Sequence, residues 1–391
     1  MRIAVIVPEL GLGTGYSVVV ENLLAGLARQ HEVGLFSVFP RHSDRERSTQ
    51  VPYPLEEYAA GETRPVERNL SRMSRYFGVD AERLTWLEQR VAAFDAKRII
   101  GFNYNMVPFV GQMRSDVPKI VDVIDSQILY SLRELQNGHF GRGNLKHFLA
   151  AIMIGRENFP KFAATVTVSS ADTESLQRYG NARNVLTVPN GVDHEWYAPN
   201  PAISRKEPPR VIFCGSLSFP PNVQAVEWFV STCWTEIQRL QSNAEFLVIG
   251  KNPPADLGPR LEKYAGVRVV GFVDDVRRYI LESAVSVAPM VSGTGIKNKI
   301  LEAWALGTPV VATPLAVKGL FYERDVNILI GKSADEFAAA TASLLADRQR
   351  REQIGAAGRA HVMRHYSWDT FRAKFNSIVE EPLKYRDRAT D

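Results

Sequence analysis

The sequence predicts an α/β protein of two domains, each built around a parallel β-sheet. Three observations carry this prediction: a chain of 391 residues, short β-branched runs that alternate with helical patterns, and a proline-rich segment after which the same rhythm restarts. At about 150 residues per domain, the length allows two to three domains. With 45% hydrophobic and 23% charged residues, the composition is that of a globular protein in water.

The first half of the chain alternates strands and helices. Between the first two expected strands, apolar residues over 16–27 recur every three or four positions, which is typical of one helical face. A strand, a helix and a second strand in this order form a βαβ unit, which favours a parallel sheet. The expected strands are 3–7, 33–39, 98–102, 119–124, 165–169 and 185–188.

The second half repeats this order after the proline-rich stretch, which predicts a linker between two domains. Further strands are expected at 211–214, 245–249, 267–270, 285–289 and 309–312. From about residue 366, apolar residues at helical spacing are followed by no further strand, so we expect a terminal helix that packs back on the first domain. The predicted boundaries are 1–195 for the first domain, 196–209 for the linker, 210–365 for the second domain and 366–391 for the terminal helix.

Charge and cysteine content exclude several classes of protein. A net charge of +4 is too weak to predict a nucleic-acid partner. The two cysteines, Cys214 in a strand-like run and Cys233 in a helix-like one, offer no disulfide framework, and no apolar run approaches the roughly 18 residues of a membrane span. We therefore expect a cytoplasmic protein, and nothing in the sequence indicates its oligomeric state. Arginines at 64, 68, 72 and 75 leave a peripheral contact with the inner face of a membrane open, with a solvated helix as the alternative.

A glycine-rich loop follows the first strand. Gly11, Gly13 and Gly15 would let backbone amides approach an anion at the start of the next helix. Their spacing does not fit the dinucleotide-binding pattern, and no lysine follows as in a phosphate-binding P-loop. A tight turn from strand to helix is the alternative.

The most informative segment runs from residue 286 to 309 and predicts a strand, a glycine-rich loop and a short helix. Lys297 and Lys299 lie where the helix macrodipole is positive, which disfavours each lysine by about 0.3–1 kcal/mol. A bound diphosphate would reverse this effect, so we predict an anion site here. An ion pair between Lys299 and Glu302 on a solvated helix is the alternative, but it leaves Lys297 unexplained.

At these residues the sequence resembles the family-4 glycosyltransferases of the GT-B architecture, and the likeness covers nearly the whole chain. Four segments match that family's landmarks in its order: 188–193, 271–276, 286–289 and 302–313. The resemblance implies two Rossmann-like domains that face a central cleft, with a nucleotide-sugar donor held mainly by the C-terminal domain and an acceptor mainly by the N-terminal one. It also implies retention of the anomeric configuration, with no metal and no cofactor.

Carried over residue by residue, the resemblance assigns Glu302 to the donor ribose hydroxyls. It assigns the segment 296–298 to the diphosphate, and Phe272 with Val273 to the base. The glycine loop would face the donor phosphate and the acceptor. The residues thus expected to bind the donor are Glu302, Lys297, Lys299, Thr294, Gly295, Ile296, Asn298, Ser216, Phe272 and Val273, with Gly13, Thr14 and Gly15 in the phosphate and acceptor loop.

Three departures from the family pattern bear on the site. Thr294 stands where a second glutamate is common, and two cations expected after the first strand of the second domain are missing near Ser216 and Pro221. We expect Lys297 and Lys299 to replace those cations. Ile124 stands where a histidine is expected; the next residue, Asp125, is our candidate for orienting the acceptor, with capping of the following helix as the alternative.

The sequence therefore predicts a metal-independent retaining glycosyltransferase. It would move a sugar from a nucleoside diphosphate sugar to a hydroxyl of a glycan, a lipid-linked saccharide or a small molecule, as in polysaccharide biosynthesis. The residues expected to act in catalysis are Asp125, Lys297 and Lys299. Two alternatives stay open: a nucleotide-sugar-binding protein without transfer activity, and a GT-B sugar-nucleotide epimerase.

Overall fold

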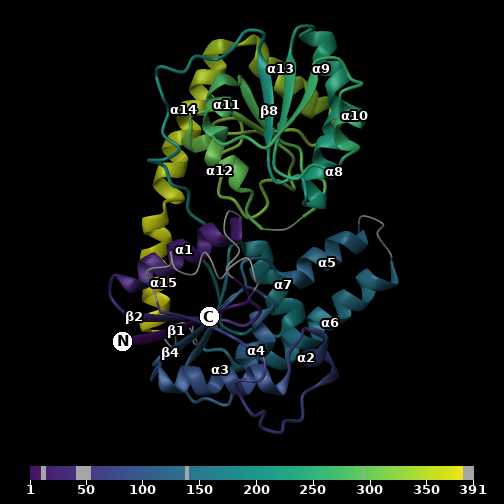
Figure 1. The fold of residues 1–391 in the computed structure, drawn as a ribbon. Coiled ribbons are helices and arrows are strands. Elements are labelled where there is room, and N and C mark those ends of the chain that lie inside the picture. The colour runs from purple at the N-terminus through teal and green to yellow at the C-terminus, as the bar shows by residue number, and fades with distance from the viewer. Residues whose placement is uncertain (10–14, 41–53, 137–140, 294, 382–391) are drawn as a thin grey trace. The chain divides into compact units, whose positions relative to one another are not determined.

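The chain folds into two compact α/β units in the computed structural model, which describes residues 1–9, 15–40, 54–136, 141–293 and 295–381 (Figure 1). Unit 1 comprises Met1–Pro189 and Phe371–Asp391, and unit 2 comprises Asn190–Thr370. Each unit has one parallel sheet, which confirms the predicted fold class.

Unit 1 is built on a seven-stranded sheet in the order β3-β2-β1-β4-β5-β6-β7. The five inner strands of this sheet are largely apolar and buried, as expected where helices cover a parallel sheet, whereas its two edge strands are half-buried. The strands are β1 (Arg2–Val7), β2 (Glu32–Ser37), β3 (Leu55–Glu57), β4 (Arg98–Phe102), β5 (Lys119–Asp122), β6 (Ala164–Thr167) and β7 (Val185–Thr187).

Several helices of unit 1 begin at a side-chain cap. Asp80 and Ser169 accept backbone N–H groups at the starts of α3 and α7, which satisfies donors that have no partner within the helix. The helices are α1 (Gly15–Ala28), α2 (Arg72–Tyr76), α3 (Ala81–Ala93), α4 (Met106–Gln112), α5 (Gln127–Gln136), α6 (Arg142–Asn158), α7 (Ser170–Gly180) and α15 (Trp368–Glu380), with a 3-10 turn at Phe159–Lys161.

The terminal helix α15 packs on unit 1 although it comes last in the sequence. The Arg98 guanidinium donates to the carbonyl of Val379 at 2.9 Å, and Lys374 donates to the carbonyl of Thr187 at 2.7 Å. Asn376 donates to the carbonyl of Gly26 on α1 at 3.2 Å, and Figure 1 shows α15 (yellow) alongside α1 (purple).

Unit 2 has a six-stranded sheet in the order β10-β9-β8-β11-β12-β13. Its strands are β8 (Arg210–Cys214), β9 (Glu245–Ile249), β10 (Val267–Gly271), β11 (Val285–Ala288), β12 (Val310–Ala312) and β13 (Leu329–Ile330). Its helices are α8 (Pro220–Phe229), α9 (Thr235–Leu240), α10 (Leu257–Leu261), α11 (Val276–Glu282), α12 (Asn298–Ala305), α13 (Ala334–Ala346) and α14 (Arg348–His365), with a π-helical turn at Val230–Trp234 joining α8 to α9.

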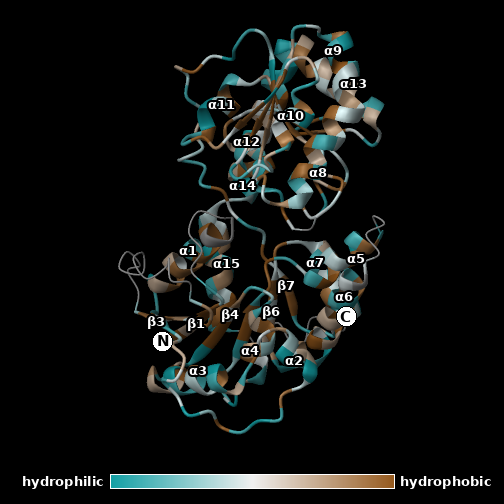
Figure 2. Cartoon of the chain, turned by 45° about the vertical axis from the view of Figure 1, so that its right-hand side comes forward, coloured by the Kyte–Doolittle hydropathy of each residue, from teal (hydrophilic) through white to brown (hydrophobic). Residues whose placement is uncertain are grey.

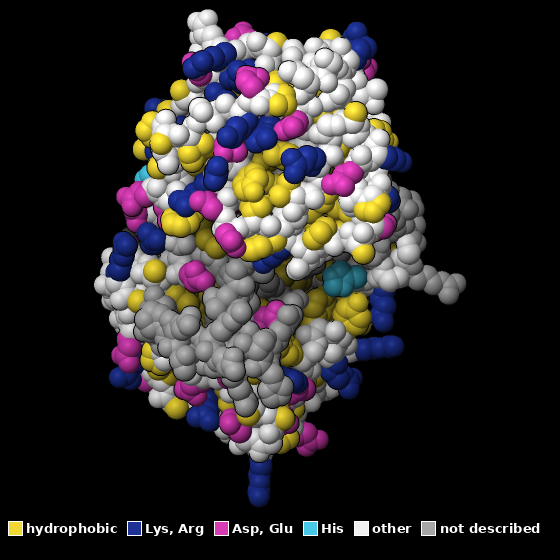
Figure 3. Space-filling model, turned by 45° about the horizontal axis from the view of Figure 1, so that its top comes forward, with side chains coloured by type: hydrophobic (Ala, Val, Ile, Leu, Met, Phe, Trp, Pro, Cys, Tyr) yellow, Lys and Arg dark blue, Asp and Glu magenta, His cyan; other side chains and the backbone are white. Residues whose placement is uncertain are grey.

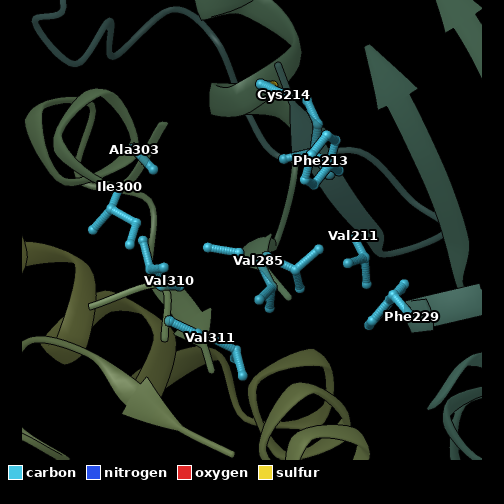
Figure 4. Close-up of a cluster of buried hydrophobic side chains, with 14 of the residues drawn as sticks. Val211, Phe213, Cys214, Phe229, Val285, Ile300, Ala303, Val310 and Val311 are labelled. Carbon is cyan, nitrogen blue, oxygen red and sulfur yellow. The ribbon is translucent and has the colours of Figure 1, made fainter. Parts of the chain in front are cut away.

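The core of unit 2 fixes the position of α12, the helix of the predicted anion site. Ile300 and Ala303 of α12 are fully buried, and they belong to the same apolar cluster as Phe213 of β8 and Val285 of β11 (Figure 4). Figure 2 shows the same layering in both units: the strands are hydrophobic, while the helices carry hydrophilic outer faces. Because buried side chains hold both α12 and the strands, the loops between them are set on a rigid frame.

The structure differs from the sequence prediction in where the chain passes between the units. The sequence places a linker at 196–209, whereas the structure groups residues 190–209 with unit 2. The reason is a set of contacts within that unit: Val192 bridges to Ser367, and the backbone N–H of Lys206 donates to the carbonyl of Glu282 at 2.9 Å. Strand β5 also ends at Asp122, two residues earlier than expected, because Ile124 has a φ of +58° that no strand allows.

Candidate functional site

The loops at the carboxyl edge of the unit 2 sheet lie against one another. This edge is where open parallel sheets bind ligands, most often beside the strand at which the order reverses. Gly215, after β8, and Gly250, after β9, approach so closely that a Cβ on Gly250 would lie 1.9 Å from the Gly215 carbonyl oxygen. The backbone N–H of Leu217 donates to the carbonyl of Lys251 at 2.9 Å, which ties the two loops together.

Lys299 extends from the first turn of α12 into the loop after β8. Its ammonium donates to Asn222 Oδ1 at 2.8 Å and lies 3.7 Å from the centre of the Phe213 ring. Burial lowers the pKa of Lys299 to about 7. The ammonium therefore occupies the loop in which the sequence lacks the family's two cations.

Lys297 is the N-cap residue of α12, and its side chain also turns inward. It is 8% exposed, and its ammonium donates to the carbonyl of Gly295 at 2.9 Å. Among the residues that the structure describes, no side chain caps the first turn of α12, and the adjacent Asn298 Oδ1 is buried with no hydrogen-bond partner. Two inward-turned lysines thus lie at the positive end of a helix dipole, which is an arrangement that a bound anion would stabilise.

Glu302 lies one turn further along α12, where its carboxylate accepts a hydrogen bond from the Tyr197 hydroxyl. Burial raises the pKa of Glu302, and the nearby Lys299 ammonium and the Tyr197 hydrogen bond oppose this rise. Tyr197 lies in the segment that the sequence treats as a linker. Its role could not be anticipated from spacing, because no local pattern links it to α12.

The remaining predicted donor residues lie at the same edge of the sheet. Ser216 follows β8, and its hydroxyl lies 2.9 Å from the Ser218 hydroxyl. Phe272 follows Gly271, the last residue of β10, and is 68% exposed. Gly295 has a φ of +69°, which a glycine adopts without strain. Val273 and Ile296 are half-buried on the same set of loops.

Some predicted residues lie outside the described part of the chain. These are Gly13, Thr14 and Thr294, so their roles stay predictions. Gly15 is described as the first residue of α1.

Asp125 belongs to unit 1, in the turn between β5 and α5. Helix α5 is capped by Ser126, whose hydroxyl accepts from the backbone N–H of Leu129 at 3.2 Å, so the cap is the residue after Asp125. The charge of Asp125 favours the charged form of Arg133 on α5, whose pKa burial lowers. Its role toward an acceptor stays a prediction.

Sequence reasoning missed a second carboxyl group in this turn. Asp122 is the last residue of β5 and is 1% exposed, and its Oδ1 accepts from the backbone N–H of Ile124 at 3.0 Å. Burial raises the pKa of Asp122 to about 7. Its position as the polar end of an otherwise apolar strand is the signal that could have identified it.

A surface of unit 1 combines exposed apolar side chains with cations. Leu145, Leu149 and Met153 recur every four residues along α6 and are 49%, 51% and 54% exposed. Tyr76 of α2 is 42% exposed, and the Lys146 ammonium lies 4.9 Å from the centre of its ring. We call this the α2–α6 surface; its exposed cations are Arg72, Arg75, Lys146 and Arg156.

The helix expected to carry the arginines at 64, 68, 72 and 75 is shorter than the sequence suggests. The helix covers only Arg72–Tyr76, and Arg68 before it is turned inward, with a 5% exposed side chain paired with Glu88. On the face of the molecule in Figure 3, cations (dark blue) and anions (magenta) are interspersed. Among the described residues, no helix is long and apolar enough to span a bilayer, and no three His, Cys, Asp or Glu side chains form a group that could hold a metal ion.

Known sequences are similar to part of this chain, mainly within unit 2. Residues 208–347 match the model of the glycosyl transferases group 1. A GDP-mannose-dependent alpha-(1-6)-phosphatidylinositol monomannoside mannosyltransferase of Mycobacterium tuberculosis is 30% identical over 240 residues, covering 55% of this chain and 61% of the relative. A phosphatidyl-myo-inositol mannosyltransferase of Mycobacterium leprae is 26% identical over 211 residues, covering 50% of this chain and 54% of the relative. The chain thus spans little more than half the length of these relatives.

Solved structures match the fold over the whole chain. Sucrose-phosphate synthase from Thermosynechococcus elongatus superposes with a TM-score of 0.76 at 15% identity, covering 98% of this chain and 99% of the other. Anabaena HepE in complex with UDP-glucose gives a TM-score of 0.70 at 15% identity, with 97% and 99% covered. At such identities the likeness concerns the fold, which in these neighbours is GT-B. Residues 208–347 thus match the glycosyl transferases group 1 model, and the chain as a whole has the fold of GT-B enzymes.

Proposed function

We propose that this protein transfers a sugar from a nucleoside diphosphate sugar to an acceptor hydroxyl, with retention of configuration and without a metal. The observation that carries the proposal is the pair of inward-turned lysines at the start of α12. Lys299 extends toward the loop after β8 and Lys297 is the N-cap residue of α12, so both cations lie at loops where an anion would bind. Burial of the Lys299 ammonium is costly unless a ligand shares the site.

The chemistry follows from where charge develops. The leaving diphosphate gains negative charge as the glycosidic bond breaks, and preorganised cations and helix amides stabilise that charge in the transition state. Lys297, Lys299 and the first amides of α12 supply them. The departing phosphate oxygen can take the acceptor proton, so this route requires no carboxylate nucleophile. Glu302 would accept the two ribose hydroxyls, since a carboxylate has two acceptor oxygens.

We infer that the donor is a GDP-sugar. The two mannosyltransferases of Mycobacterium tuberculosis that are 30% identical to this chain are named as GDP-mannose-dependent. Their sequence identity to this chain is twice that of HepE, the neighbour solved with UDP-glucose, which is 15% identical. Phe272, 68% exposed beside Gly271, would stack on the base. A thermal-shift panel of GDP-mannose, UDP-glucose, ADP-glucose and dTDP-glucose tests this directly. At 100 times its dissociation constant, the correct donor stabilises by about 2.7 kcal/mol, or roughly 5–10 °C for a domain of this size.

Transfer is then measured with the donor that binds. We expect sugar transfer to a mannosylated phosphatidylinositol acceptor, with slow donor hydrolysis in its absence. Glu302→Gln should weaken donor binding, and Glu174→Gln, which removes the same charge from an exposed glutamate of α7, is the matched control. Donor binding without transfer or hydrolysis would favour a binding protein, and conversion of the donor without any acceptor would favour an epimerase. A uniform lack of response to all four donors would refute the proposal.

We also propose that the α2–α6 surface contacts an anionic bilayer, where a lipid-linked acceptor would be found. Exposed Leu149 and Met153 would enter the interface while the surrounding cations meet lipid phosphates. Co-sedimentation with vesicles of phosphatidylcholine and phosphatidylinositol tests this. We expect Leu149→Asp with Met153→Asp to abolish binding, while Leu240→Asp, at an equally exposed leucine of unit 2, leaves it intact. Equal binding by both variants would refute it.

A further inference from the structure

Unit 2 contains a cavity at the end of its sheet opposite the loops described above. The cavity, of about 580 Å³, lies where the chain enters the strands: its walls are the segment before β8, the turn between α12 and β12, and the first three turns of α14. This volume falls within the range of small-molecule sites. Its apolar wall includes Pro199, Pro201, Ile203, Leu281, Leu306 and Ala356.

Four arginines line the cavity against two glutamates. Arg205 comes from the segment before β8, and Arg348, Arg351 and Arg359 recur along one face of α14. The glutamates, Glu207 and Glu352, leave two positive charges in excess. Glu352 is already paired with Arg348 at 2.8 Å. Like charges therefore face one another here: burial lowers the pKa of Arg205, and the neighbouring Arg351 lowers it further.

Three of the arginines also contact the carboxyl ends of helices, and these contacts use only part of each guanidinium. Arg205 Nε donates to the carbonyl of Ser283, after α11, at 3.3 Å. Arg351 Nη1 donates to carbonyls in the last turn of α13, each at 2.7 Å, while its Nε is buried with no partner in the described part of the chain. Arg359 Nη1 donates to the carbonyl of Ala305, the last residue of α12. A guanidinium has five N–H donors, so several remain to bind a ligand.

We propose that this cavity binds the phosphate group of a small phosphorylated metabolite, at a site separate from the donor loops. Arginine forks suit a phosphate because they donate two parallel hydrogen bonds to its oxygens. Two excess positive charges match one phosphate dianion. The apolar wall would hold the organic part of the same ligand.

Calorimetric titration with inorganic pyrophosphate tests the proposal. We expect two binding events in the wild type, one at the lysines of α12 and one in the cavity. Arg205→Gln with Arg348→Gln should weaken one event at least tenfold, and Lys299→Met should weaken the other. A control, Arg239→Gln with Arg260→Gln, removes the same charge from exposed ion pairs elsewhere in unit 2 and should leave both events unchanged.

Two results would overturn the proposal: equal pyrophosphate binding by the cavity variant and the control, or loss of all binding in Lys299→Met. If the double arginine variant fails to fold, the same pyrophosphate titration of Ala356→Trp tests the site instead. Ala356 is an exposed alanine of α14 on the cavity wall, and the indole would fill the cavity without removing a charge. If Ala356→Trp shows both pyrophosphate-binding events with wild-type affinity, the proposal that the cavity binds a phosphate group is refuted.

Discussion

Replacing Lys299 by methionine should stabilise the ligand-free protein, by an amount that depends on pH. Burial lowers the pKa of Lys299 from 10.5 to about 7, so the folded chain holds this group less favourably in its charged form than the unfolded chain does. With an unfolded pKa near 10.4, the cost is on the order of 5 kcal/mol at pH 6 and about 2 kcal/mol at pH 9. The unfolded chain binds more protons over this range, so the wild type gains stability as the pH rises from 7 to 10.

The variant carries no titrating group at this position, so its advantage should shrink by about 3 kcal/mol between pH 6 and pH 9. Loss of the hydrogen bond to Asn222 Oδ1 subtracts about 1 kcal/mol at both pH values, because the neutral amine donates this bond as the ammonium does. Urea denaturation of wild type and variant at the two pH values measures the difference, with the exposed Lys263→Met as control. An advantage that is equal at pH 6 and pH 9 would refute the reasoning.

Two further predictions concern backbone packing and a buried carboxyl group. Gly250→Ala should cost about 3 kcal/mol or more in unfolding free energy, because its Cβ would lie 1.9 Å from the Gly215 carbonyl oxygen; Gly258→Ala, with nothing within 4 Å, should cost nothing in the same urea titration. Asp122→Asn should gain stability relative to wild type as the pH rises, because the folded pKa of about 7 exceeds the unfolded one. The gain should be roughly 2 to 3 kcal/mol larger at pH 8 than at pH 5, and a pH-independent difference would contradict it.

The sheets were predictable from sequence because parallel strands buried on both faces are continuous apolar runs. β1 and β9 could be identified in this way, and so could the parallel order that their helices impose. β3, at Leu55–Glu57, and β13, at Leu329–Ile330, were missed because three and two residues carry no periodicity. The end of β5 was missed for another reason: the positive φ of Ile124 follows from the Asp122 side chain holding its N–H, which is a contact rather than a pattern.

The candidate site was predictable only where residues break a local rule. Lys297 and Lys299 stand out because cations at the start of a helix are disfavoured, and that rule needs only neighbouring residues. Tyr197 and Asn222 could not be found in this way. Their partners, Glu302 and Lys299, are distant in sequence, and only the fold brings the groups together.

Cations at the two ends of the unit 2 sheet should affect stability in opposite ways. At the carboxyl edge, the Lys299 ammonium is buried and lies at the positive end of the α12 dipole, and both effects disfavour its charge. Removing the charge should therefore stabilise the ligand-free fold. At the other edge, Arg205 and Arg351 contact the carboxyl ends of α11 and α13, where a cation is favourable. Removing either should destabilise by about 0.3–1 kcal/mol. A lysine that lowers stability has no structural benefit to explain its presence, so it requires a ligand. The arginines already have a structural role, and only titration of the cavity itself can establish a second one.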